Sequence, residues 1–174
     1  LAHPNIKESQ ANKALVDAVS DMEGVAVFNL YELSQEIAFN IDEWSKIISD
    51  ASAVIYQFPF YWMSAPSLLK KWQDEVFTFL SKTPAVAGKS LTVVTTTGSE
   101  YEAYRSGGRN RFTMDELLRP YQVSAIHSGM SWQTPIVVYG MGTADAGKNI
   151  AEGANLYKQR VEMLIGNSNA GNNW

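Results

Sequence analysis

Strand-like and helix-like segments alternate along this sequence, and the alternation restricts the possible fold more than any other feature. Short apolar runs rich in β-branched residues predict strands at 25–31, 52–58, 90–97 and 134–140. The run at 52–58 is apolar at nearly every position, as expected for a strand buried on both faces. Between these runs, apolar residues recur at helical spacing, most clearly at 68–80. Such alternation predicts parallel strands with helices on both faces of the sheet.

A further strand is expected at the start of the chain. The residues "LAHPN" read like the exit of a strand, and Leu1 is not an initiator methionine, so we expect earlier strand residues to be missing. Counting that segment, the sequence predicts an α/β three-layer sandwich with a five-stranded parallel sheet of order 2-1-3-4-5. One domain would cover residues 1–166. We expect the polar tail 167–174 to be disordered.

The composition excludes several classes of site. The chain has no cysteine, which excludes disulfides, thiolate catalysis, iron–sulfur clusters and cysteine zinc sites. Its two histidines lack carboxylates at matched spacing, so no metal site is predicted. A net charge of -4 with scattered basic residues argues against nucleic acid as a partner. No apolar run approaches the ~20 residues needed to span a bilayer, and no signal peptide is visible, so we expect a cytoplasmic protein.

Three loops carry the candidate chemistry. In a sheet of this order, ligands bind beyond the carboxyl ends of the strands, where the strand order reverses. The loops expected to meet there are His3–Asn12, Pro59–Ala65 and Thr96–Arg111. The first ends at the start of a predicted helix, whose free N–H groups and positive dipole end favour a phosphate. The side chains of His3, Ser9 and Asn12 would add hydrogen bonds, although a plain N-cap at Ser9 explains the same pattern.

The second loop, "FPFYWMSAP", places three consecutive aromatic residues directly before a helix. The backbone N–H groups of Phe60, Tyr61 and Trp62 are expected to point at the edge of a heteroaromatic ring, with an aromatic side chain against its plane. An aromatic cluster that covers a helix end or a dimer contact explains the loop equally well. The third loop leaves its strand through "TTTG", and its glycine allows the backbone to approach a ligand closely.

Taken together, these motifs resemble those of one family. His3-Pro4 is followed by Ser9 and Asn12, then by "QFPFYW" with "P-x-LLK-x-W-x-D-x-VF", and then by "TTTG" and "LRP". This combination resembles the flavodoxin-like NAD(P)H:quinone oxidoreductases, and most of all their short bacterial branch. That branch includes the ancillary flavoproteins of glutathione-gated potassium efflux systems and general-stress NAD(P)H oxidoreductases. The resemblance runs from His3 to about Leu164.

The resemblance implies a flavodoxin-like fold, a flavin and a set of residues that hold it. The phosphate end would be held by His3, Ser9, Gln10, Ala11 and Asn12. One side of the ring would be lined by Phe60, Tyr61, Trp62 and Met63, with Pro59 fixing the backbone before them. The pyrimidine edge would be held by Thr96, Thr97, Gly98 and Ser99. FMN is the expected cofactor and FAD the second choice, because the chain lacks the extra segment of longer relatives. NADH or NADPH would then reduce the flavin, and a quinone would be reduced after the nicotinamide leaves.

Tyr104 is the expected catalytic residue, because its distance from Gly98 matches that of the active-site tyrosine in the mammalian relatives. The histidine that those relatives place further along the loop is replaced here by Asn110, which puts a tyrosine–histidine proton relay in doubt. The resemblance also implies a homodimer with each pocket at the dimer interface.

Two other functions remain in competition. The chain resembles the ancillary proteins around "AYRSGGRNRFTMDELLRP", so a regulatory subunit that binds a potassium efflux antiporter, peripheral at the inner face of the membrane, is the alternative. A one-electron flavodoxin carrier is disfavoured, because the first loop is not rich in hydroxyl groups and glycine.

Overall fold

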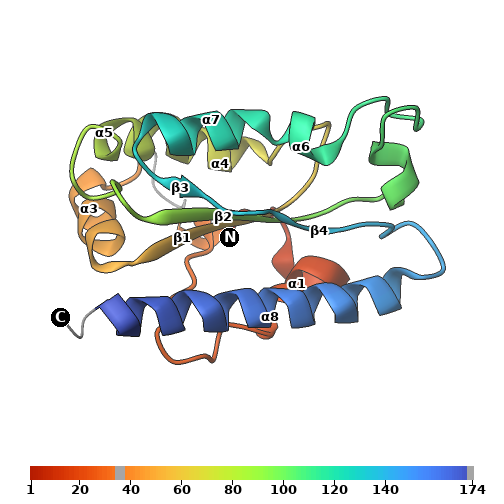
Figure 1. The fold of residues 1–174 in the computed structure, drawn as a ribbon, viewed down its shortest axis with the longest axis horizontal. Helices are drawn as coiled ribbons and strands as arrows, with labels where there is room; N and C mark the ends of the chain where they lie inside the picture. Colours follow the sequence, from red (N-terminus) through yellow and green to blue (C-terminus); the bar gives the residue numbers. More distant parts are fainter. Residues whose placement is uncertain (34–37, 172–174) are drawn as a thin grey trace.

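A four-stranded parallel sheet lies between two layers of helices in the computed structural model, which describes residues 1–33 and 38–171 (Figure 1). The strands are β1 (Ala53–Pro59), β2 (Ser90–Thr96), β3 (Ser131–Trp132) and β4 (Ile136–Val138). In the middle, β2 pairs with β1 on one side and with both β3 and β4 on the other, always in parallel. The predicted parallel α/β sheet is therefore confirmed.

The prediction of five strands is wrong for the part of the chain that the structure describes. The last predicted strand, 134–140, is shortened to β4, and the two-residue strand β3 precedes it along the same edge of β2. Pro135 lies between them, and proline has no N–H to donate to a ladder. No strand forms at 25–31 or at the first residues of the chain.

Backbone hydrogen bonds nevertheless hold these two segments beside β1. The Ala2 N–H donates to the Gln57 carbonyl at 2.9 Å, and the Leu30 N–H donates to the Leu1 carbonyl at 2.9 Å. The Leu1 amino group donates to the Phe28 carbonyl. Residues 1–2 thus lie between Gln57 and residues 28–30, where the expected order puts the first strand. Residues 25–29 build no ladder, and the residues that follow form the short helix α2 (Leu30–Leu33).

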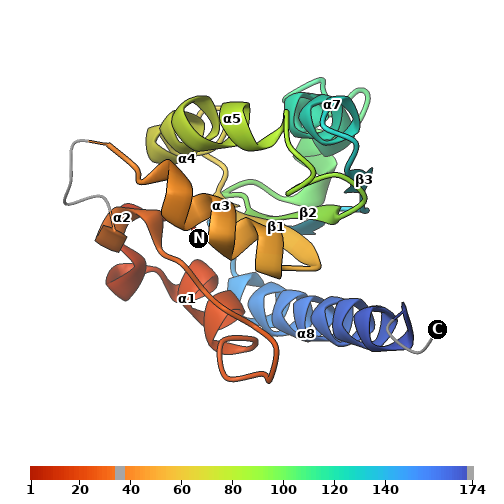
Figure 2. The same cartoon turned by 90° about the vertical axis from the view of Figure 1, so that its left-hand side faces the viewer.

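Helices cover both faces of the sheet, so the predicted layers are confirmed (Figures 1 and 2). One layer holds α4 (Ser67–Trp72), the π-helical stretch η2 (Gln73–Phe77), α5 (Thr78–Leu80), α6 (Met114–Leu117) and α7 (Arg119–His127). The other layer holds α1 (Gln10–Asp17) and α8 (Ala146–Gly171), while α3 (Ile41–Asp50) packs near β1. Helices α6 and α7 are separated at Leu118, two residues before Pro120. Helix α8 continues past residue 166, where the expected tail begins, and residues 172–174 lie outside the described residues.

Two apolar cores follow from the alternation of side chains along the strands. Val93 of β2 packs with α4 and α7, whereas the next residue, Val94, packs with α1 and α8. The sheet is therefore buried on both faces, as the apolar runs predicted. None of the helices within 1–33 and 38–171 is both long and apolar enough to cross a membrane.

Candidate functional site

The first loop ends at the start of α1, where several hydrogen-bond donors gather. Ser9 caps the helix, because its hydroxyl oxygen accepts from the Asn12 N–H at 3.1 Å. The N–H groups of Gln10 and Ala11 lie in the open first turn and have no acceptor within the described residues. The Ser9 hydroxyl hydrogen also remains available for donation. This end of α1 can therefore bind an anion through its backbone and its cap.

His3 lies earlier in the same loop, six residues before Ser9. It is buried, and its Nδ1 accepts from the Asn5 N–H at 3.1 Å. Burial lowers the pKa of His3, which favours the neutral imidazole. Because Nδ1 accepts, the proton sits on Nε2, and that N–H is the one His3 can donate. A role for this Nε2–H beside the start of α1 in anion binding stays a prediction.

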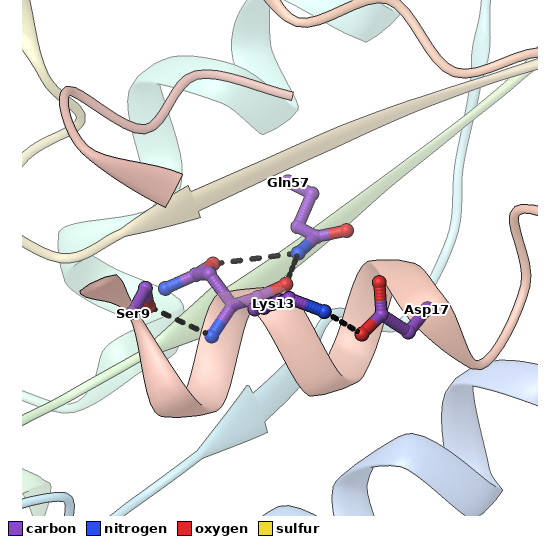
Figure 3. A network of polar contacts seen from close by, with 5 residues as sticks. Ser9, Lys13, Asp17 and Gln57 are labelled. Atoms are coloured by element: carbon purple, nitrogen blue, oxygen red, sulfur yellow. Dashed lines mark hydrogen bonds and ion pairs between the residues drawn. The ribbon is translucent and has the colours of Figure 1, made fainter. Parts of the chain in front are cut away.

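The Asn12 side chain was predicted to bind a phosphate, but it is hydrogen-bonded within the protein instead. Its Nδ2 donates to the Thr96 hydroxyl at 3.0 Å, and the Gln57 Nε2 donates to the Asn12 carbonyl at 2.8 Å. Figure 3 shows Gln57 reaching toward the middle of α1, to one side of the cap residue Ser9. Asn12 is only 1% exposed and Thr96 only 6%. These bonds tie α1 to β1 and β2, so Asn12 and Thr96 position the site rather than offer free groups to a ligand.

The aromatic loop forms a tight turn. Tyr61 and Ser64 exchange two backbone hydrogen bonds, at 2.8 and 3.0 Å. The two residues between them, Trp62 and Met63, have positive φ angles of 48° and 61°, as in a type I′ turn. Left-handed backbone costs roughly 1–2 kcal/mol at each of these bulky residues, and strained residues of this kind cluster at functional sites.

The turn corrects the expectation about which backbone groups face a ligand. The N–H of Phe60 donates to the Thr96 carbonyl at 2.9 Å, and that of Tyr61 donates to Ser64. Both are therefore committed within the protein. The N–H groups of Trp62 and Met63 have no acceptor within the described residues, and the Trp62 side chain is 98% exposed. The free donors and the open aromatic face thus belong to the tip of the turn, while Phe60 is buried beneath it.

The loop after β2 is fastened to the loop after β4. Three backbone hydrogen bonds join the two loops: the N–H groups of residues 140, 141 and 142 donate to the carbonyls of Ser99, Thr97 and Gly98, respectively. The Thr97 N–H donates to the Val138 carbonyl, whereas the N–H groups of Gly98 and Ser99 have no acceptor among the described residues. A Cβ built at Gly98 would meet open space, so a ligand can approach that backbone. Arg109 adds a bond to the Ser99 hydroxyl at 2.5 Å.

Tyr104, the expected catalytic residue, is buried inside an aromatic group. Its ring centroid lies 6.2 Å from that of Phe60 and 5.8 Å from that of Tyr139. Tyr139 was not among the predicted site residues. The strand exit "VYG" could have revealed it, because β4 ends at the same edge of the sheet as the other two strands. Asn110 donates its N–H to the Ala103 carbonyl and so helps to shape the loop around Tyr104.

A cavity lies away from this edge, and no metal centre is found in the described part of the chain. No group of three or more His, Cys, Asp or Glu side chains that could hold a metal occurs within 1–33 and 38–171. A cavity of about 520 Å³ lies between residues 24–28 and β1, with mostly apolar lining. Its lining includes none of the residues 58–63 or 97–99. The candidate site is therefore the open carboxyl edge with its free donors.

Comparison with known proteins finds relatives that span most of the chain. A family model with a flavodoxin-like fold matches residues 1–161. General stress protein 14 of Bacillus subtilis is 35% identical over 92% of this chain and 94% of its own. An uncharacterized NAD(P)H oxidoreductase, YdeQ, of the same organism is 34% identical over 94% of this chain and 85% of its own. The glutathione-regulated potassium-efflux system ancillary protein KefG of Pectobacterium atrosepticum is 35% identical over 79% of this chain and 78% of its own.

Solved structures are similar over a comparable length. General stress protein 14 of Treponema denticola, in complex with FMN, has a TM-score of 0.83 at 28% identity and covers 94% of this chain and 95% of its own. An NADPH-quinone reductase from P. pentosaceus has a TM-score of 0.78 at 27% identity, over 91% of this chain and 93% of its own. A structure described as a thermophilic tryptophan halogenase from Streptomycin violaceusniger has a TM-score of 0.84 at 34% identity, over 92% of this chain and 95% of its own.

Proposed function

This chain belongs to the flavodoxin-like family, and we propose that it is an FMN-dependent NAD(P)H oxidoreductase that reduces quinones or similar acceptors in two-electron steps. The observation that carries the proposal is the set of unpaired N–H groups that three loops present at one edge of the sheet. A structural relative contains FMN, and others are named as NAD(P)H oxidoreductase or NADPH-quinone reductase. The structure described as a halogenase shares the fold, so the fold alone does not select the acceptor.

The donor set fits FMN from one end to the other. The start of α1 offers the N–H groups of Gln10 and Ala11 with the Ser9 hydroxyl and His3, which suits a phosphate. The turn offers two N–H groups and the exposed Trp62 indole, which suits a flat aromatic ring with polar edges. Phe60, Tyr61 and Thr97 hold the backbone around these groups in place.

Bound FMN would supply the redox chemistry, accepting two electrons from NADH or NADPH and passing them to the acceptor. The protein's part is to orient the ring and to stabilise negative charge on it. The free N–H groups of Gly98 and Ser99 are fixed donors, because their loop is fastened to residues 140–142. Tyr104 stands beside this loop and would face the acceptor from within the aromatic group.

The first test is an absorption spectrum of the purified chain with added FMN, followed by anaerobic addition of NADH or NADPH. The proposal requires that FMN binds and that its absorption bleaches within the time of mixing. Trp62→Ala is expected to weaken FMN binding about two- to tenfold, since ring stacking contributes on the order of 0.5–1.5 kcal/mol. Phe79→Ala is the matched control, because Phe79 is also exposed, at 55%, but lies on α5. Absence of FMN binding at excess cofactor would overturn the proposal and every assigned contact.

Assembly as a homodimer, with the second subunit completing the pocket, is part of the same proposal. Tyr61 and Met63 are each 47% exposed beside the fully exposed Trp62, so the turn presents apolar surface that a partner subunit would cover. Sedimentation of the wild type and of Trp62→Ala tests this. A monomer at micromolar concentration in both would remove the dimer from the proposal.

A second candidate function is favoured by the relatives named as potassium-efflux ancillary proteins. In that function the chain would bind the cytoplasmic domain of an antiporter, and its turnover would be secondary. A pull-down with such a domain separates the two functions, because a reductase without this partner gives no retained complex.

A further inference from the structure

A row of residues crosses the sheet just beyond the ends of three strands. The strand register aligns Pro59 with Thr96, and Thr96 with Val138. The next residues along the chain, Phe60, Thr97 and Tyr139, therefore follow one another across the sheet. Phe60 and Tyr139 both pack against the apolar core on the α4 and α7 side. Tyr139 is thus placed at the carboxyl edge of the sheet, on the same face as Phe60, which lies beneath the aromatic turn.

Tyr104 joins the two ends of this row. Its ring makes an edge contact with Phe60 and a tilted contact with Tyr139. Tyr139 also meets Tyr101 edge to face, with ring centroids 5.3 Å apart. Tyr104 is buried and Tyr139 is half-buried, so Tyr139 is the more accessible tyrosine of the pair.

The backbone of Tyr139 is fixed on both sides. Its carbonyl accepts from the Asn149 Nδ2 at 2.9 Å, and the neighbouring Gly140 donates its N–H to the Ser99 carbonyl. Gly140 has a φ of 77°, and a Cβ there would lie 3.1 Å from both Asn149 and Thr143. Because the backbone of Tyr139 is already fixed, little free energy is lost to reorganisation when the residue contacts a ligand.

The surroundings keep Tyr139 protonated. Burial raises its pKa to about 12, and the nearby Tyr101, Asp115 and Tyr104 act in the same direction. The Arg105 guanidinium lies over the Tyr101 ring, at 5.2 Å from its centroid. At neutral pH the phenol is therefore a hydrogen-bond donor.

We propose that Tyr139 lines the acceptor pocket beside Tyr104 and donates a hydrogen bond from its phenol to the acceptor oxygen on which negative charge develops. The inference rests on the proposed function and adds a residue to that same site. A hydrogen bond to developing charge should change the rate of acceptor reduction about 10- to 100-fold. Reduction of bound FMN by NADH or NADPH does not use this donor.

Two measurements on the FMN-loaded protein test the inference, with Tyr139→Phe as the variant and Tyr157→Phe as the matched control. Tyr157 is another buried phenol, but it packs between α8 and the opposite face of the sheet. Stopped-flow absorption gives the two half-reactions separately, with menadione as the acceptor. Tyr139→Phe is expected to slow acceptor reduction about 10- to 100-fold and to leave FMN reduction within about twofold. Tyr157→Phe is expected to change neither.

Fluorine NMR of the chain labelled with fluorotyrosine provides a readout that needs no turnover. The Tyr139 resonance, identified by its loss in Tyr139→Phe, should shift when menadione is added to the oxidised, FMN-loaded protein, and the Tyr157 resonance should not. An unmoved Tyr139 resonance, or equal slowing of both half-reactions with weaker FMN binding, overturns the inference while the proposed function stands. A wild type that binds no FMN overturns the proposed function and this inference with it.

Discussion

Replacement of Thr96 by valine tests whether the Thr96 hydroxyl binds the protein or the cofactor. In the structure this hydroxyl accepts from the Asn12 Nδ2 at 3.0 Å, and the two residues are 84 positions apart in the chain. Valine keeps the β-branched shape that suits a central strand and removes only the acceptor. The variant therefore leaves a buried amide without its partner and leaves the strand itself intact.

The expected cost follows from the burial of that amide. Asn12 is 1% exposed, so water cannot replace the lost acceptor. An unsatisfied buried donor costs about 1–3 kcal/mol, and a loss of about 2 kcal/mol lowers the Tm of a domain of this size by about 4–8 °C. Removing both partners, in Asn12→Ala with Thr96→Val, should cost less than the sum of the single changes. Lys13→Ala is the control, because its ion pair with Asp17 on the same helix is exposed and contributes at most about 0.5 kcal/mol.

The assay is urea unfolding of the FMN-free protein, monitored by circular dichroism, together with FMN titration of the folded variant. We expect Thr96→Val to unfold at lower urea and to keep the wild-type affinity for FMN within about threefold. A variant as stable as the wild type that has lost FMN binding would refute the reasoning, because it would show that the Thr96 hydroxyl serves the cofactor.

Three further predictions concern two loop glycines and a helix cap. Gly98→Ala should leave the Tm unchanged but weaken FMN binding at least about tenfold in a fluorescence titration, because its Cβ meets only the open space that the ligand would enter; unchanged affinity would remove Gly98 from the site. Gly108→Ala should lower the stability by about 2 kcal/mol, since its Cβ would lie 2.1 Å from the Glu102 carbonyl oxygen, and urea unfolding measures this; a wild-type midpoint would contradict it. Hydrogen bonds from Thr113 lower the pKa of Glu116 from its usual 4.5, so this capping contribution is present above that pH and is lost as pH falls through the folded-state pKa. Glu116→Gln should therefore show a smaller loss of Tm between neutral and acidic pH than the wild type, and parallel pH profiles would argue against it.

Local patterns in the sequence were sufficient to predict that helices cover both faces of a parallel sheet. The run at 52–58 is apolar because both of its faces are buried, and the helical spacing at 68–80 marks the face that packs on the sheet. The loop at Pro59–Ala65 was also predictable, because a proline at a strand exit constrains the backbone nearby. The strand at 25–31 was predicted wrongly, since a strand requires a partner as well as a suitable composition.

The sequence by itself determined that three loops meet at one edge, because parallel strands end on the same side of a sheet and the alternation requires parallel strands. Only the tertiary structure decided which groups in those loops are free. Phe60 and Tyr61 use their N–H groups within the protein, while Trp62 and Met63 do not. The reason is that helical and strand periodicity depend on residues a few positions apart, whereas these hydrogen bonds, and the contact between Tyr104 and Tyr139, depend on the register between distant strands and loops.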